Sequence, residues 1–145
     1  MKITICGSVK FSQKMHESYK FLISHGYKVY LPEGVIDFIH GNLDFELGTL
    51  SRKEGAKRKK DYDLIRKYYR KIQESDAILV INEEKNGIKN YIGANTLIEM
   101  AFAHVLDKKI YLLNGFPKFD YPLEEVIAME PVILNGDLGK IINSN

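Results

Sequence analysis

The chain has 145 residues, 45% of them hydrophobic, which is the size of one ordinary domain with enough apolar side chains to bury a core. We therefore predict a single domain over residues 1–145. The formal net charge of +2 is too small to favour a nucleic-acid partner, and the apolar runs are too short to cross a membrane. With a single cysteine, no Cys/His cluster and no visible targeting segment, we expect a cytoplasmic protein without a disulfide or a structural metal.

The first part of the chain predicts two strands and a helix. Residues 2–8 form an apolar run that ends in Gly-Ser, and residues 12–26 carry apolar side chains at helical spacing until a glycine ends the pattern. Residues 27–32 predict a second strand that Pro32 ends. Residues 33–57 have no clean period and contain four glycines, so we predict a variable insert there.

The second part of the chain continues the alternation of helices and strands. Helical spacing returns over residues 57–74, and residues 76–82 are an apolar run typical of a strand that is covered on both faces. The remaining predicted elements are a helix at 92–106, a strand at 108–114, a short helix at 122–129, a fifth strand at 131–135 and a final turn at 136–142.

This order of elements predicts an α/β fold. Strands that alternate with helices and read as continuous apolar runs indicate a parallel sheet with helices on both faces. With right-handed crossovers, we expect a flavodoxin-like (Rossmann-like) three-layer sandwich whose parallel five-stranded sheet has the order 2-1-3-4-5. Ligands bind such sheets beyond the carboxyl ends of the strands where the winding direction reverses, here between the first and third strands. The loops that meet there are residues 6–10 and 82–95.

Glu99 is an acid within a predicted helix that is apolar nearly all round. Thr96 and Glu99 match the T-x-x-E capping box, and Asn95 is an equally good helix cap, so a structural role explains the acid. A buried carboxylate otherwise needs a partner or a solvent-filled pocket, and this helix begins at the predicted ligand crevice. In a partly dry cleft a carboxylate can act as a nucleophile toward a sugar carbon, which is chemistry that needs no metal or cofactor. The pattern alone leaves capping and chemistry equally open.

Three segments carry a resemblance to a known family. Residues 3–9, "ITICGSV", residues 75–82, "SDAILVIN", and residues 93–113, "GANTLIEMAFAHVLDKKIYLL", resemble the nucleoside 2-deoxyribosyltransferases and the related 2'-deoxynucleoside 5'-monophosphate N-hydrolases. The resemblance implies that Glu99 is the nucleophile that takes the deoxyribosyl group. It also implies a nucleoside or nucleotide as the small-molecule ligand, and a homo-oligomer, a dimer or larger, in which a neighbouring chain contributes to each pocket.

Further candidate residues combine the resemblance with position and charge. Gly7 and Ser8 inherit the family's substrate-lining turn, and the residues that open the helix before Glu99 are placed to donate hydrogen bonds to a sugar or a 5'-phosphate. Lys10, Arg52 or the cluster at 57–60 would add positive charge beside a phosphate. The candidate substrate-binding residues are Gly7, Ser8, Lys10, Asn82, Gly93, Asn95 and Thr96. The candidate accessory residues are Asp63 and Tyr68, near the place of a family aspartate that handles the leaving base, and Tyr91, which can stack on a base.

Several of these features also have a structural interpretation. The basic run at 52–60 is typical of a solvated loop that enters a helix. Tyrosines at helical spacing, such as Tyr62 and Tyr69, are typical of half-buried packing, and Cys6 is typical of a buried thiol.

The sequence leaves three functions open. The leading hypothesis is cleavage or transfer at the N-glycosidic bond of a (deoxy)nucleoside or its monophosphate. The second is a non-catalytic nucleotide-binding or sensing module, because Gly93 stands six residues before Glu99, where the transferases commonly carry an aspartate. The third is an RNA- or partner-binding module that uses the basic run at 52–60.

Overall fold

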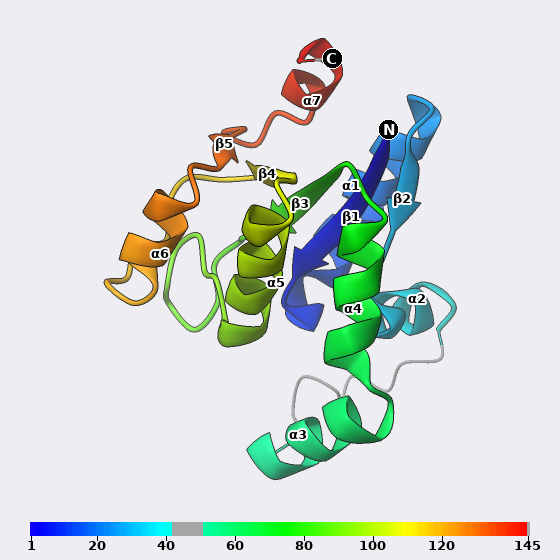
Figure 1. The fold of residues 1–145 in the computed structure, drawn as a ribbon, viewed down its shortest axis with the longest axis vertical. Coiled ribbons are helices and arrows are strands. Elements are labelled where there is room, and N and C mark those ends of the chain that lie inside the picture. The colour runs from blue at the N-terminus through cyan, green and yellow to red at the C-terminus, as the bar shows by residue number, and fades with distance from the viewer. Residues whose placement is uncertain (42–50, 145) are drawn as a thin grey trace.

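A parallel sheet forms the middle layer of the computed structural model, which describes residues 1–41 and 51–144 (Figure 1). Its order is β2-β1-β3-β4-β5, and every neighbouring pair is parallel, which confirms the predicted topology. Gly7 of β1 pairs with Ile81 of β3, so these two strands end side by side. The strands are β1 (Lys2–Gly7), β2 (Lys28–Tyr30), β3 (Ala77–Ile81), β4 (Lys109–Leu112) and β5 (Val132–Ile133).

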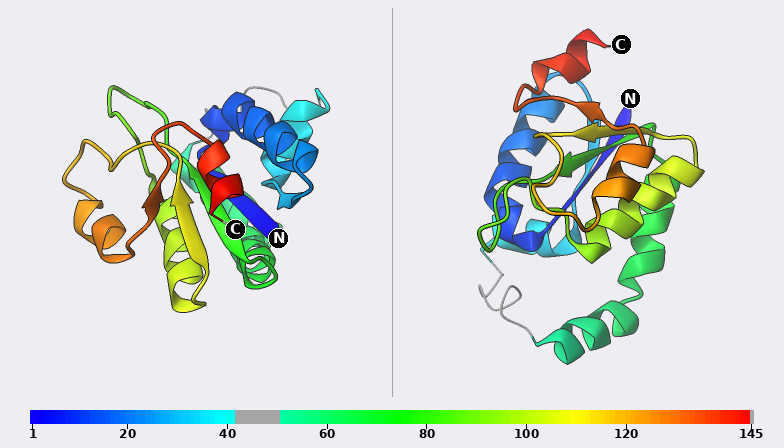
Figure 2. Two further views of the ribbon diagram at one scale, coloured as in Figure 1. Left: turned by 90° about the horizontal axis from the view of Figure 1, so that it is seen from above. Right: turned by 90° about the vertical axis from the view of Figure 1, so that its left-hand side faces the viewer.

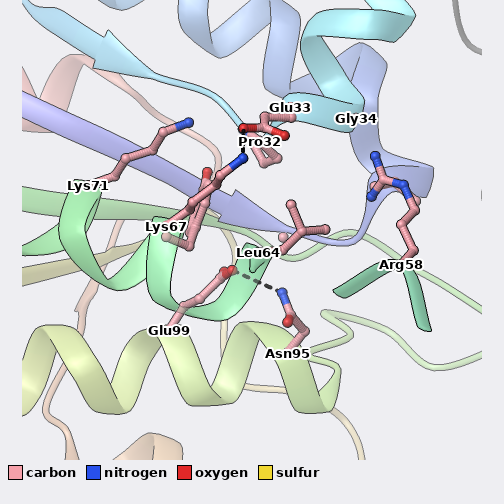
Figure 3. A pocket seen from close by; sticks show the side chains of 12 residues that line it. Pro32, Glu33, Gly34, Arg58, Leu64, Lys67, Lys71, Asn95 and Glu99 are labelled. Carbon is pink, nitrogen blue, oxygen red and sulfur yellow. Dashed lines mark hydrogen bonds and ion pairs between the residues drawn. The ribbon is translucent and has the colours of Figure 1, made fainter. Parts of the chain in front are cut away.

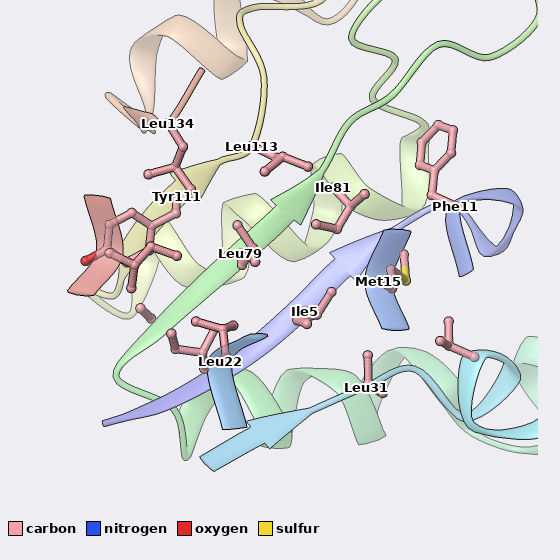
Figure 4. Close-up of a cluster of buried hydrophobic side chains, with 14 residues drawn as sticks. Ile5, Phe11, Met15, Leu22, Leu31, Leu79, Ile81, Tyr111, Leu113 and Leu134 are labelled. Atoms are coloured by element: carbon pink, nitrogen blue, oxygen red, sulfur yellow. The ribbon is translucent and has the colours of Figure 1, made fainter. Parts of the chain in front are cut away.

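Helices cover both faces of the sheet, as expected for a three-layer sandwich (Figure 2). Alternate residues of β1 face opposite sides of the sheet. Ile3 and Ile5 enter the core beneath α1, where Figure 4 shows Ile5, and Cys6 enters the core beneath α4 and α5. The first core includes side chains of α1 (Ser12–Ser24), α2 (Glu33–Ile39) and α7 (Gly139–Asn143), and the second includes side chains of α4 (Leu64–Gln73), α5 (Ala94–Val105) and α6 (Leu123–Ala128). None of the helices in the described part of the chain combines the length and the apolar character needed to cross a membrane.

The prediction of one helix over residues 57–74 is wrong, because the chain forms α3 (Arg52–Asp61) and α4 with a break between them. Asp63 has a φ of 50°, a left-handed backbone conformation that a continuous α-helix does not contain. The helix α3 therefore turns away from the sheet (Figure 1). None of its side chains is buried. The predicted insert at 33–57 also contains regular structure, namely α2 and the start of α3, while residues 42–50 lie outside the described residues.

The helix that carries Glu99 begins later than predicted, at Ala94 instead of residue 92. Gly93 is the N-cap, and it has no side chain with which to cap the helix. Because Asn95 and Thr96 are already inside the first turn, neither occupies the cap position, and the predicted T-x-x-E capping box with Glu99 does not form. Capping therefore does not account for the acid at this position.

Candidate active site

A cavity lies at the carboxyl end of β1, between the loop after β2 and the helices α3, α4 and α5 (Figure 3). This is the side of the sheet where the order of strands predicts a ligand crevice. Figure 3 shows Glu99 pointing from α5 toward Leu64 and Lys67 of α4. The residues that line the cavity are Gly7, Val9, Pro32, Glu33, Gly34, Arg58, Leu64, Lys67, Tyr68, Lys71, Asn95 and Glu99.

Glu99 is held in this cavity by hydrogen bonds from two elements. Glu99 is only 7% exposed. Its Oε1 accepts a hydrogen bond of 2.9 Å from Nδ2 of Asn95, which lies one turn earlier on α5. The Cys6 thiol of β1 also hydrogen-bonds to the Glu99 carboxyl. The amide oxygen of Asn95 accepts in turn from Nζ of Lys59 on α3, again at 2.9 Å. The carboxyl is thus buried, oriented and linked to one cation.

Burial raises the pKa of the Glu99 carboxyl to about 8. The hydrogen bonds from Cys6 and Asn95 and the positive charge of Lys59 act in the opposite direction, so they favour the carboxylate. Burial likewise raises the pKa of the Cys6 thiol, and the nearby Glu99 adds to this effect, so Cys6 stays a neutral donor. A titratable group whose pKa is moved so far, in a cavity with specific partners, is typical of an active site.

A second cavity adjoins the first and shares Gly7, Val9 and Asn95 with it. Its other lining residues are Ser8, Lys59, Lys85, Tyr91, Gly93, Ala94 and Thr96. Nζ of Lys85 donates to Oγ of Ser8 at 3.1 Å and lies 4.9 Å from the centroid of the Tyr91 ring. The N-terminus of α5, which has no side-chain cap, opens on the same space. Two lysines and the backbone N–H groups of the first turn of α5 suit this cavity to an anion.

Gly7 forms a wall of both cavities because no larger residue fits there. Its φ is 152°, and a Cβ at this position would lie 2.8 Å from the Ile81 carbonyl oxygen and 2.7 Å from Cε of Met15. Contacts under 3.0 Å require the neighbouring atoms to move, and the carbonyl belongs to the backbone of β3. A glycine here lets the chain leave β1 tightly against β3 and turn into the site.

Asn82 does not take part in either cavity, although its position after β3 made it a candidate substrate-binding residue. Its side chain is fully buried, donates to the Gly115 carbonyl at 2.9 Å and accepts from the Asn114 backbone N–H at 2.9 Å. These bonds join the loop after β3 to the loop after β4. We therefore leave Asn82 out of the substrate-binding set that we propose.

Three further candidates have surroundings that differ from the expectation. Tyr68 borders the first cavity, but its hydroxyl donates to the Ile5 carbonyl inside the core. Asp63 lines neither cavity and forms an ion pair with Arg66 at 3.1 Å. Lys10 is exposed and lines neither cavity, although its charge acts on the nearby amine of Lys85. The other candidates, Gly7, Ser8, Tyr91, Gly93, Asn95 and Thr96, all lie at one or both cavities.

Several charged residues at the site were not singled out from the sequence. Lys85 lies within the loop at 82–95, which the sequence places at the crevice. The sequence does not show, however, that the Lys85 side chain points into the cavity. Lys67 and Lys71 are one turn apart on α4 and share one face, and Lys67 lies 3.6 Å from the carboxylate of Glu33 at the start of α2. In the described part of the chain, no three His, Cys, Asp or Glu residues are grouped so that they would hold a metal ion.

A solved structure resembles this chain over nearly its whole length. No protein-family model matches the chain, and no curated protein sequence matches it. The solved structure of a CMP N-glycosidase from Clostridium botulinum, BcmB, superposes with a TM-score of 0.54 at 17% sequence identity, and the match covers 99% of each chain. At this identity the likeness shows a shared fold over essentially the whole chain.

Proposed function

We propose that this chain cleaves the N-glycosidic bond of a (deoxy)nucleoside 5'-monophosphate, with Glu99 as the nucleophile. The observation that carries the proposal is a buried carboxylate whose Oε1 is held by Asn95 inside a cavity at the carboxyl end of β1. The family resemblance of the segment around Glu99 supports the same role. The fold shared with a CMP N-glycosidase is consistent with it.

The reaction proceeds through two displacements at the same sugar carbon. A carboxylate oxygen of Glu99 attacks C1' while the C1'–N bond breaks, and the base leaves with the electron pair of that bond and takes up a proton. Water then attacks C1' of the glycosyl ester, the bond between C1' and Glu99 breaks, and the carboxylate is regenerated as a proton passes to solvent. If a second base attacks in place of water, the same intermediate yields a new nucleotide. The Asn95 hydrogen bond orients the carboxyl for both steps.

The test of this function is the release of free base. The protein is incubated with a panel of ribo- and deoxyribonucleosides and their 5'-monophosphates, and the products are separated by chromatography. We expect base release from at least one monophosphate, and addition of a second free base distinguishes transfer from hydrolysis. Absence of base release across the panel would refute the catalytic proposal.

The second cavity supplies the binding site for the 5'-phosphate in this proposal. Lys85 and Lys59 provide positive charge, and the N-terminus of α5 provides backbone N–H groups. Because burial lowers the pKa of the Lys85 amine, and the charge of Lys10 adds to this, a bound dianion would favour its charged form.

Substitution of Lys85 by methionine should therefore weaken binding of the monophosphate selectively. We expect KM for the monophosphate to rise about tenfold, the size of one charge-assisted hydrogen bond, while KM for the parent nucleoside stays the same. Lys89→Met serves as the matched control because Lys89 is exposed on the same loop and lines neither cavity. An equal change in KM for the nucleoside and the monophosphate would show that Lys85 does not bind the phosphate.

A non-catalytic nucleotide-binding module is the second candidate function. The observation in its favour is that Asp63 pairs with Arg66 outside both cavities, so it is not placed to handle a leaving base. Calorimetric titration with nucleoside monophosphates separates the two candidates. Binding without base release supports the module, whereas binding with base release supports the enzyme.

We also propose that the chain forms a homodimer through the outer face of α4 and α5. Ile65, Ile98 and Val105 are apolar and exposed on these two helices, and Val105 is 79% exposed. The rings of Tyr69 and Phe102, one turn along from Ile65 and Ile98 on their helices, meet edge to face with centroids 5.2 Å apart. Exposed apolar side chains on two neighbouring helices are typical of a protein interface.

The double substitution Ile65→Glu and Val105→Glu should convert the dimer to a monomer. Two charges on each partner, buried without counter-ions, oppose association strongly. Sedimentation velocity of the wild type and the variant measures the change, and Ile127→Glu on α6 controls for the addition of charge at an exposed isoleucine. A wild-type protein that sediments as a monomer at micromolar concentration would contradict the proposal.

A further inference from the structure

Lys59 reaches the candidate nucleophile through one intermediate side chain. It lies on α3, 36 residues before Asn95 in the sequence, and its Nζ is 2.9 Å from Oδ1 of Asn95. Nδ2 of the same amide is 2.9 Å from Oε1 of Glu99. A cation, an amide and the buried carboxyl thus form a chain of two hydrogen bonds.

The chemistry of the first member fixes the direction of both bonds. An ammonium group can only donate hydrogen bonds, so Lys59 requires the amide to present its oxygen. The amide must then present its NH₂ group to Glu99, where it donates to Oε1. This arrangement matches a carboxylate, which only accepts hydrogen bonds.

A protonated Glu99 is a weaker partner for this arrangement of the amide. Its carbonyl oxygen can still accept from Nδ2 of Asn95, but a hydrogen bond to a charged acceptor is roughly twice as strong as one to a neutral acceptor. Donation from its hydroxyl to Oδ1 of Asn95 would require the amide to rotate, which would place the NH₂ group against the Lys59 ammonium. Lys59 therefore favours the ionised form of Glu99 both by its charge and by the orientation that it imposes on Asn95.

Other titratable groups face the Glu99 cavity, but among the described residues only Lys59 and Glu99 hydrogen-bond to the Asn95 amide. Cys6 donates directly to Glu99, and the hydroxyl of Tyr68 is taken by the Ile5 carbonyl. Lys59 is the charge that acts on Glu99 in favour of its carboxylate form. The other charged groups that line the cavity are Glu33 on α2, Arg58 on α3, and Lys67 and Lys71 on α4.

We propose that Lys59 is a positioning residue that acts through the Asn95 amide to orient Glu99 and to favour its ionised form. The inference rests on the proposed function for its catalytic meaning, but the link between Lys59 and Glu99 is testable without turnover. The variant is Lys59→Met, with Lys59→Arg as the conservative rescue and Lys60→Met as the control. Because α3 buries no side chain, none of these substitutions removes a core contact.

The first measurement is the titration of the Glu99 carboxyl by ¹³C NMR of glutamate-labelled protein, with Glu99→Gln to assign the signal. In Lys59→Met the midpoint should move upward by about one pH unit, whereas Lys59→Arg and Lys60→Met should titrate like the wild type. The second measurement is the pH dependence of kcat/KM with a nucleoside and with its monophosphate. The acid limb of this profile should shift upward by about one pH unit for both substrates. At pH values below the limb, kcat/KM of Lys59→Met should therefore be about tenfold lower than that of the wild type.

An unchanged Glu99 titration in Lys59→Met would overturn the inference. A rise in KM confined to the monophosphate, with the pH profile unmoved, would also overturn it, because Lys59 would then be a phosphate contact alone. A shifted titration in a protein that releases no base from any substrate would support the link from Lys59 to Glu99 while refuting the proposed function. The two failures are therefore distinguishable.

Discussion

Replacement of Glu99 by glutamine should reduce base release about a thousandfold or more while the protein stays folded. Glutamine has the same shape and still presents an oxygen to Nδ2 of Asn95, so the hydrogen bond at 2.9 Å can be kept. Its neutral amide cannot form the glycosyl ester, so the first displacement fails. Binding of the nucleotide should survive, because the positive charge of the second cavity is untouched. Single-turnover base release and calorimetric titration measure the two effects separately.

The matched control for this substitution is Glu84→Gln, which removes an exposed carboxylate from the loop before α5. We expect the control to release base at the wild-type rate. Thermal unfolding of both variants establishes that the fold is intact. If Glu99→Gln released base at a rate comparable to the wild type, Glu99 would not be the nucleophile, and Glu33, the other carboxylate that lines the cavity, would be the next residue to replace.

The sequence was sufficient to predict the sheet order and the place of Glu99 because both depend on regular, local patterns. Apolar runs that alternate with helical periodicities lead to a doubly wound sheet, and the reversal of winding places the loops after the first and third strands together. Gly7 and Gly93 lie in those loops, and both line the second cavity. Because Gly7 pairs with Ile81, the ends of β1 and β3 lie side by side.

The sequence was insufficient where a residue's role depends on tertiary contacts or on an unusual backbone conformation. The helical spacing of Tyr62, Ile65, Tyr69 and Ile72 runs on across the break between α3 and α4, so the left-handed conformation of Asp63 interrupts a pattern that gives no sign of it. That break is what allows α3 to turn away from the sheet. The contact of Lys59 with α5 spans 36 residues, so no local spacing reveals it.

Asn82 is a residue whose position in the sequence predicts a role in the site, although its side chain makes its contacts elsewhere. Its place directly after β3, at the predicted crevice, made it a candidate ligand for the substrate. The side chain instead satisfies buried backbone groups of the loop after β4, at Asn114 and Gly115. A polar residue at the end of a strand has both options, and the sequence does not say which way its side chain turns.

The stability of the protein should fall as the pH rises from about 5 to about 8, because of Glu99. Its pKa is raised from 4.5 to about 8 in the folded protein, so in this interval the folded state holds a proton that the unfolded state has lost. Stability then decreases with pH by up to about 1.4 kcal/mol per pH unit. The full contribution of Glu99 to stability is present below its pKa in the unfolded state, 4.5. It is lost once the pH reaches its pKa in the folded state, about 8. Ionisation of the buried acid is therefore what costs stability in this interval.

Urea unfolding of the wild type and Glu99→Gln at several pH values between about 5 and 8 isolates this effect, because every other titrating group is common to both proteins. The free energy of unfolding of the wild type, relative to the variant, should decrease steadily over the interval. Cys6 and Tyr68 also have raised pKa values, but they act above their ordinary values of 9.0 and 10.0 and leave the interval undisturbed. Parallel curves for the two proteins would show that Glu99 is ionised across the whole interval in the folded state. In that case Cys6, Asn95 and Lys59 together would offset the effect of burial on the pKa of Glu99, and the free enzyme would keep its nucleophile ionised over this interval.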